Sequence, residues 1–143
     1  MKINAAGLAL IKEFESLRLE AYLPTPDDVP TIGYGHTRGV AMGDTCTEAQ
    51  ADAWLLEDLA WAEDCVEGAV AKLLHENEHA ALVSLCFNIG CTAFKNSTLV
   101  RLLNEGDFDA AEKQFARWNK QAGRELAGLT RRRAAEEQLF AST

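Results

Sequence analysis

The sequence contains no long apolar run, and its few prolines are confined to one place. No segment approaches the roughly 20 apolar residues of a membrane-spanning helix, although 48% of the side chains are hydrophobic. The 3 prolines all lie between Pro24 and Pro30, a stretch that cannot continue a helix. The first residues space their apolar side chains as a helix face interrupted by Lys12 and Glu13, which is not a signal-peptide pattern. The sequence therefore predicts a protein that is cytosolic when synthesised and does not insert into a membrane.

Basic side chains are also scarce. The chain carries 14 Lys and Arg against 22 Asp and Glu, a net charge of −8. Phosphate binding needs clustered Lys and Arg, so this balance argues against nucleic acid as the main partner. The run Arg131–Arg133 is the one candidate for a basic patch, although such runs are more often solvated helix faces.

The cysteines do not have the spacing of a zinc site. There is no Cys-x-x-Cys, and the neighbouring histidines lack nearby thiols, so we expect no metal and no cofactor. Buried free thiols are the default for such residues, and disulfides become accessible only in an oxidising compartment such as the periplasm. The four cysteines are Cys46, Cys65, Cys86 and Cys91.

The stretch from Glu13 to Thr37 changes its periodicity twice. Apolar residues over 8–14 recur at helical spacing, and those over 17–23 recur at every second position. A proline-containing turn follows, and 31–37 reads as a returning strand whose glycines let other groups approach its backbone. This pattern predicts a helix leading into a β-hairpin, with Glu15 at the junction. Partial desolvation there favours the protonated form of a carboxyl group, as a general acid requires.

The two segments FESLRLEAY and PTIGYGHT resemble the active-site segment of the phage T4-type lysozymes, the endolysin muramidases of glycoside hydrolase family 24. In that family the glutamate is the catalytic acid and the threonine lines the cleft. The resemblance therefore implies that Glu15 is the acid and that Thr31 serves the attacking water.

The second half predicts a series of helices. A capping box at Thr47 opens a long helix within 48–73, with Leu55, Leu59 and Leu73 on one apolar face, and Asn77 is expected to cap a helix over 78–89. Ser97 or Thr98 is expected to cap a short helix over 99–104, and Asp107 to cap the next, whose apolar face runs from Phe108 to Trp118. The last helix is expected over 129–140. The segments ALVSLCFNIG, NSTLVRLL, DAAEKQFARWNK and GLTRRRAAEEQLF resemble phage lysozymes, especially endolysins related to the lambdoid phage 21 enzyme. The resemblance implies one lysozyme-like α+β domain, mostly helical, over 1–143. A small β-hairpin lobe (about 14–50) would be joined by the long helix to a larger helical lobe (about 60–143 plus the N-terminal helix).

The resemblance also implies roles around the glycan, which would bind between the lobes. Tyr34, Thr37, Phe87 and Ser97 (or Thr98) would contact substrate, although Phe87 reads equally well as core packing. His36 would be structural, tied to an acidic residue of the other lobe, rather than an acid–base group. One arginine of the 131–133 run, taken as Arg132, would pair with the catalytic glutamate.

The resemblance breaks at the second catalytic position. Family members usually place Asp nine residues after the glutamate, where this chain has Pro24, and the following loop is one residue longer. The second role therefore falls to Asp27 or Asp28, with Asp27 slightly favoured by strand parity, or to no carboxylate at all.

The resulting interpretation is a muramidase that cleaves the β-1,4 bond between N-acetylmuramic acid and N-acetylglucosamine with inversion. Two alternatives stay open: a lytic transglycosylase giving 1,6-anhydro ends, and a non-catalytic peptidoglycan-binding module. By resemblance the protein would be a monomer held in the host cytoplasm until a holin releases it to the periplasm.

Overall fold

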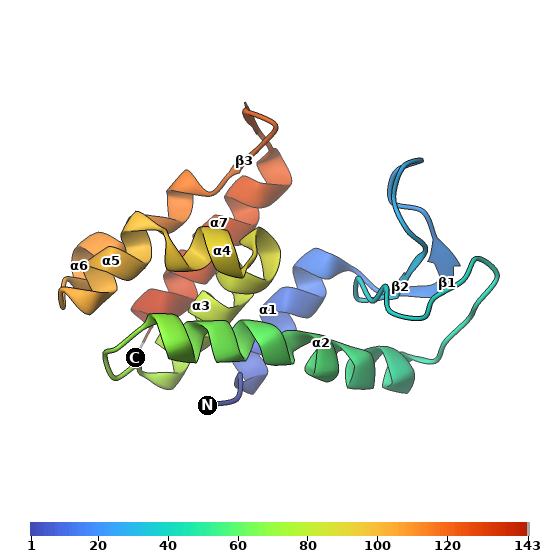
Figure 1. Cartoon of the computed structure of the whole chain (residues 1–143), viewed down its shortest axis with the longest axis horizontal. Coiled ribbons are helices and arrows are strands. Elements are labelled where there is room, and N and C mark those ends of the chain that lie inside the picture. Colours follow the sequence, from blue (N-terminus) through green and yellow to red (C-terminus); the bar gives the residue numbers. More distant parts are fainter. Residues whose placement is uncertain (143) are drawn as a thin grey trace. The chain divides into compact units, whose positions relative to one another are not determined.

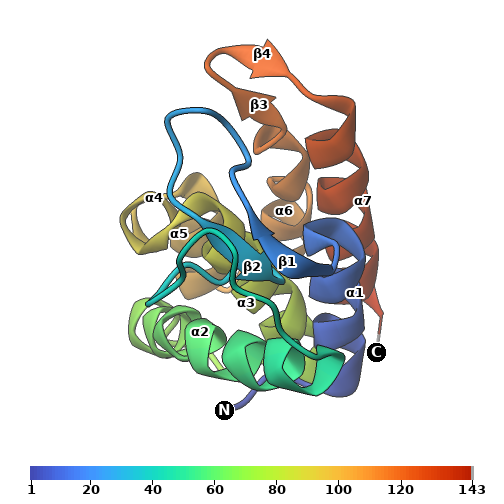
Figure 2. The same ribbon diagram turned by 90° about the vertical axis from the view of Figure 1, so that its right-hand side faces the viewer.

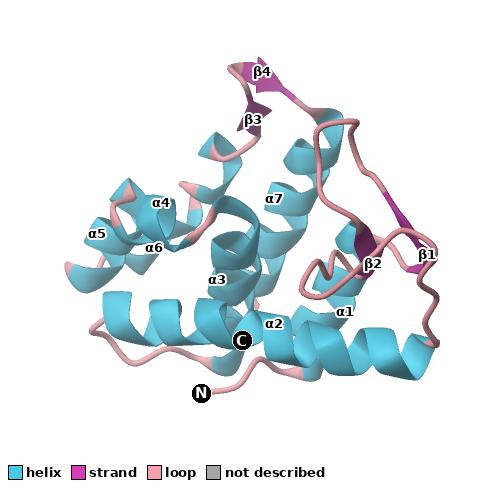
Figure 3. Ribbon diagram, turned by 45° about the vertical axis from the view of Figure 1, so that its right-hand side comes forward, coloured by secondary structure: helices cyan, strands magenta, loops and turns pink. Residues whose placement is uncertain are grey.

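The computed structural model describes residues 1–142 and is mostly helical, with two short antiparallel β-hairpins (Figures 1 and 3). The α+β fold class predicted from the sequence is therefore confirmed. Among the described residues, no helix combines the length and apolar character needed to cross a bilayer. The elements in chain order are α1 (Ala5–Glu15), β1 (Arg18–Tyr22), β2 (Thr31–Gly33), α2 (Glu48–Ala69), α3 (Glu76–Ile89), α4 (Cys91–Lys95), α5 (Thr98–Asn104), α6 (Phe108–Glu112), the 3₁₀ turn η1 (Phe115–Arg117), β3 (Lys120–Gln121), β4 (Arg124–Glu125) and α7 (Ala127–Ala141).

The chain forms two compact units. One, here called the hairpin unit, comprises Lys12–Ala60, and the other, the helical unit, comprises Met1–Ile11 together with the chain from Trp61 onward. The helices α1 and α2 each contribute residues to both units.

The hairpin unit pairs β1 with β2 in antiparallel register, Arg18 opposite Gly33 and Tyr22 opposite Thr31, with an irregularity between these pairs. Figure 2 shows the two strands side by side. The returning strand is shorter than predicted, because Gly33 and Gly35 take positive φ values of 67° and 83° and turn the chain. Ala21 is the buried residue of β1, whereas the apolar alternation predicted a longer internal face.

The long helix α2 begins with the predicted capping box. The Thr47 hydroxyl accepts from the Gln50 amide N–H at 3.1 Å, and the Gln50 side chain accepts from the Thr47 N–H at 2.9 Å. Leu55 and Leu59 are each 1% exposed on its buried face. Leu73, predicted on the same face, lies beyond the end of the helix and is 97% exposed.

The core of the helical unit is α3, which packs against α7. Eight consecutive residues of α3, His79–Cys86, are buried. The prediction that Asn77 caps this helix is wrong. His75 is the N-cap, and Glu78 completes a capping box by accepting from the His75 N–H at 2.7 Å. The Asn77 side chain instead accepts from the Asn4 side-chain amide at 2.9 Å.

Short helices complete the helical unit. Ser97 caps α5 and Asp107 caps α6, as the sequence predicts. The single helical face predicted through Trp118 is interrupted, because α6 ends at Glu112 and η1 follows as a separate 3₁₀ turn.

A disulfide joins Cys65 of α2 to Cys91 at the start of α4, within the helical unit. The default expectation of four free thiols is therefore wrong for this pair. Cys46 and Cys86 are free, and burial raises the pKa of the Cys86 thiol to about 12, so that thiol is unreactive.

The buried imidazole of His79 is expected to make the helical unit less stable at acidic pH. The side chain is 3% exposed, and within the described part of the chain neither ring nitrogen has a hydrogen-bond partner. Burial lowers the pKa of His79 below its ordinary 6.5, with a further contribution from the N-terminal amine and opposing ones from Glu63 and Glu67.

We therefore predict that the free energy of unfolding falls as pH drops below about 6.5, because there the unfolded chain binds a proton that native His79 resists. The decline from this group ends below its folded pKa, and above 6.5 the group adds no pH dependence. Urea titrations of wild type and His79→Leu between pH 8 and pH 5 measure this. An equally steep acid decline in the variant would remove His79 as the cause.

Candidate functional site

Glu15 is the last residue of α1 and is half-buried. The next residue, Ser16, has a φ of 60°, and its N–H donates to the Lys12 carbonyl at 3.1 Å. This is the αL helix-ending motif, normally occupied by glycine, and a serine there stores backbone strain. The chain thus turns sharply from α1 into β1 directly after the predicted acid.

The carboxylate of Glu15 lies against the backbone of Gly35. A Cβ added to Gly35 would come within 3.2 Å of Glu15 Oε2. Two residues earlier, at the end of β2, a Cβ on Gly33 would come within 3.2 Å of the Ala51 side chain of α2. The prediction that these glycines permit close approach to the strand backbone is confirmed at both positions.

Thr31 begins β2 and is 6% exposed. Its hydroxyl donates to the Val29 carbonyl at 3.0 Å. Because a hydroxyl has one donor and two acceptor positions, this bond fixes the side chain and leaves the oxygen able to accept from another donor, such as water.

The two loop aspartates are both exposed. Asp28 belongs to a turn in which its N–H donates to the Thr25 carbonyl at 3.0 Å and its carboxylate accepts from the Thr25 hydroxyl at 3.3 Å. This is the local bonding common for aspartate in turns. Asp27 makes no such bond among the residues described, so its carboxylate is the less engaged of the two.

His36 attaches the hairpin to α2. Its Nδ1 lies 2.7 Å from Asp58 Oδ2, and its ring stacks on Trp54 with centroids 4.5 Å apart and planes 6° apart. Its backbone exchanges two hydrogen bonds with Ile32, at 2.8 and 2.9 Å. His36 is 6% exposed, and its acidic partner lies in the same unit rather than in the other lobe.

Lys12 connects α1 to α2 one turn before Glu15. Its ammonium lies 2.8 Å from Asp52 Oδ1, and this hydrogen bond raises the pKa of Lys12. The same ammonium lies 5.6 Å from the centroid of the Tyr34 ring. Tyr34 is 7% exposed and so is mainly a packing residue in this structure, while Thr37 is exposed.

Two predicted substrate contacts lie in the helical unit. Phe87 of α3 is partly exposed, with its ring centroid 5.9 Å from that of Trp61. The Ser97 hydroxyl donates to the Phe94 carbonyl at 2.6 Å and accepts from the Val100 N–H at 3.2 Å, so it acts as a helix cap.

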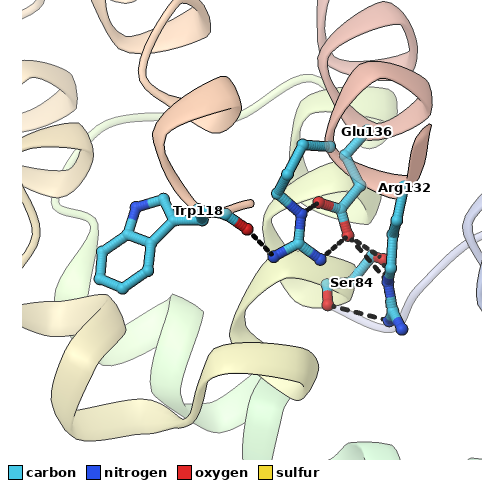
Figure 4. A network of polar contacts seen from close by, with 5 residues as sticks. Ser84, Trp118, Arg132 and Glu136 are labelled. Carbon is cyan, nitrogen blue, oxygen red and sulfur yellow. Dashed lines mark hydrogen bonds and ion pairs between the residues drawn. The ribbon is translucent and has the colours of Figure 1, made fainter. Parts of the chain in front are cut away.

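Arg132 belongs to a buried polar network on α7 (Figure 4). Its Nε donates to Glu136 Oε2 at 3.3 Å, and an Nη donates to the Ser84 carbonyl at 3.3 Å. Arg133 Nε lies 2.7 Å from Glu136 Oε1. The sequence analysis named Arg132 but not its partner Glu136. The signal available was the spacing of four residues between them on one helix, which allows their side chains to pair.

A glutamate at a helix end, next to a glycine-rich hairpin with a buried threonine, is the arrangement of a lysozyme-type glycoside hydrolase. Among the described residues, no group of three or more His, Cys, Asp or Glu side chains is arranged to hold a metal ion.

Comparison with known proteins specifies the family. Residues 12–136 match the family model described as phage lysozyme. The endolysin of Acyrthosiphon pisum secondary endosymbiont phage 1 is 43% identical and that of Salmonella phage P22 is 41% identical, each match covering 99% of both chains. Among solved structures, the muramidase domain of SpmX from Asticaccaulis excentricus superposes with a TM-score of 0.93 at 42% identity, covering 99% of each chain. The chain belongs to the phage lysozyme family, the endolysins that hydrolyse the peptidoglycan of the bacterial host.

The contact between Gly35 and the Glu15 carboxylate generates a prediction. Gly35→Ala should lower lytic activity more than tenfold, because the new methyl group displaces the carboxylate. Gly39→Ala is the matched control: Gly39 also has a positive φ, 71°, but a Cβ there meets nothing within 4 Å. Both variants should lose about 1–2 kcal/mol of stability from backbone strain. Turbidity loss and thermal melting measure the two effects, and equal activity in the two variants would contradict this account.

Proposed function

We propose that Glu15 is the general acid for cleavage of the β-1,4 bond between N-acetylmuramic acid and N-acetylglucosamine. The observation that carries the proposal is the half-buried Glu15 carboxyl held against the Gly35 backbone at the end of α1. From there the carboxyl group donates its proton to the leaving glycosidic oxygen.

In this mechanism Thr31 orients the attacking water. Its hydroxyl is fixed by the Val29 carbonyl, and its oxygen retains acceptor capacity to orient a water. A loop aspartate receives the proton of that water, and Asp27 is the better candidate because Asp28 is engaged with Thr25. Attack by water on the face opposite the leaving group gives inversion. No cofactor takes part in this mechanism.

Substrate and delivery follow from the same assignment. Thr37 in the hairpin unit and Phe87 in the helical unit remain proposed glycan contacts, because the first is exposed and the second partly exposed. The enzyme acts as a monomer and stays in the host cytoplasm until a holin opens the membrane to the periplasm. Cells that express the enzyme alone should therefore remain intact until a permeabilising agent is added.

The decisive experiment replaces the acid. Glu15→Gln keeps the size of the side chain but removes the proton to be donated, so peptidoglycan hydrolysis should fall by about 10²–10⁴. Glu13→Gln, at an exposed position of the same helix, is the matched control and should retain activity. The rate of turbidity loss measures both, and a well-folded Glu15→Gln protein with near-wild-type activity would end the assignment.

The departure at Pro24 gives a specific reason to examine the products as well. One acid/base group suffices for a lytic transglycosylase, so a missing second carboxylate would favour 1,6-anhydro ends. Mass spectrometry should show reducing ends instead.

The variants Asp27→Asn and Asp28→Asn identify the base when their rates of turbidity loss are compared with that of wild type. A deep loss of rate in only one variant assigns the role to that aspartate. Retention of activity in both would mean that Glu15 and Thr31 suffice without a loop carboxylate.

A further inference from the structure

The helical unit contains a small pocket that is lined by none of the residues assigned to hydrolysis. The pocket lies where α2 ends and along the loop that leads to α3 (Figure 1). Its volume is about 160 Å³. One water molecule needs only about 10–15 Å³ and common ligand sites have about 300–1,000 Å³, so this pocket suits a molecule of about one ring. The apolar lining residues are Met1, Val66, Val70, Leu73 and Leu74.

Hydrogen bonds fix the backbone of the two segments that supply this apolar lining. The side-chain amide of Asn104 donates to the Ala69 carbonyl at 2.9 Å, and its oxygen accepts from the Ala71 N–H at 2.8 Å. The N-terminal segment is held by the Glu63 carboxylate, which accepts from the Ile3 N–H at 2.7 Å. Because both segments are held in this way, the pocket is formed before any ligand enters it.

The imidazole of His79 is the polar group in this lining that lacks a partner. His79 lines the pocket and is 3% exposed, and within the described part of the chain neither ring nitrogen makes a hydrogen bond. Buried polar groups in native proteins nearly always have a partner, so this imidazole calls for one. A neutral imidazole offers one N–H donor and one nitrogen acceptor. A hydroxyl group can donate and accept, so it can bond to either nitrogen in either tautomer.

The charges around the pocket favour an uncharged ligand. Glu67 and Lys72 also line it, so an anion would meet the carboxylate and a cation would meet the ammonium. Burial of an incompletely compensated charge costs far more than burial of a hydroxyl that keeps a hydrogen bond. Leu73 is 97% exposed, and an apolar ligand beside it would remove part of that surface from water. The pocket therefore combines an apolar wall with one unsatisfied neutral polar group.

We propose that this pocket binds a small uncharged hydroxyl compound whose apolar body is about one ring in size, such as phenol. The hydroxyl bonds to a ring nitrogen of His79, and the ring lies against the apolar lining residues. Leu73 loses exposed surface when the ligand is bound. The proposal does not depend on the hydrolytic mechanism, and it makes His79 a binding residue rather than a catalytic residue.

The test compares phenol with toluene, which has a methyl group where phenol has its hydroxyl. NMR titrations near neutral pH, followed through the backbone amides of residues 66–79, locate the site and give the dissociation constants. The proteins are wild type, His79→Leu, Leu73→Ala and the control Leu56→Ala, an exposed leucine of α2 that does not line the pocket. In wild type, the ring-nitrogen signals of His79 are also recorded, with His36 and His75 as internal references. Thermal melting verifies that each variant is folded.

Wild type should bind one phenol per chain, about fivefold more tightly than toluene, which is the scale of one hydrogen bond. His79→Leu should bind the two probes equally, Leu73→Ala should bind both more weakly by a similar factor, and Leu56→Ala should behave as wild type. Phenol should shift the ring nitrogens of His79 far more than toluene does, and this readout decides the same point if His79→Leu does not fold. Equal affinity of wild type for the two probes, or the absence of saturable binding at residues 66–79, would overturn the proposal.

Discussion

The carboxylate of Glu136 is the group on which the packing of the helical unit depends. It is 0% exposed, and taking such a charge out of water costs several kcal/mol unless partners replace the solvent. Arg132 and Arg133 supply two guanidiniums, and the Ser84 hydroxyl donates at 2.5 Å from α3. Burial raises the pKa of Glu136 and lowers that of Arg133, while the attraction between the charges opposes both shifts. Loss of Glu136 alone would leave two buried cations, at a cost of about 3–5 kcal/mol.

The hairpin unit depends on a helix for its order. A two-stranded sheet is marginal by itself in water, so β1 and β2 need an external support. That support is α2, through the close approach of Ala51 to Gly33 and the attachment of His36 to Asp58 and Trp54. The position of Thr31 on β2 therefore depends on contacts with α2 that Gly33 and His36 make further along the chain.

The elements that local chemistry encodes could be predicted from the sequence. The capping box at Thr47, the helix caps at Ser97 and Asp107 and the helix-to-hairpin junction at Glu15 all depend on nearest neighbours. Features that require partners distant in the sequence could not be predicted in this way. His75 rather than Asn77 caps α3 because Asn77 is engaged by Asn4, and Gly7 is required within α1 because a Cβ there would come within 2.7 Å of Ala80 on α3. The Cys65–Cys91 bridge and the role of Glu136 likewise depend on tertiary neighbours.

In the proposed mechanism, Pro24 at the position of the family's usual aspartate divides the two catalytic tasks between a helix end and a loop. Glu15, the proposed acid, lies at the end of α1 between the sharp turn at Ser16 and the Gly35 backbone. Thr31 can orient a water through its lone pairs, but a hydroxyl is too weak a base to remove a proton from it at neutral pH. The proposed mechanism therefore gives that proton to the exposed loop, where Pro26 and Pro30 flank the two aspartates. Because each proline fixes its own φ and restricts the residue before it, the loop has fewer conformations to lose when a carboxylate is positioned. Pro26 and Pro30 would thus lower the entropic cost of using a loop carboxylate as the proposed base.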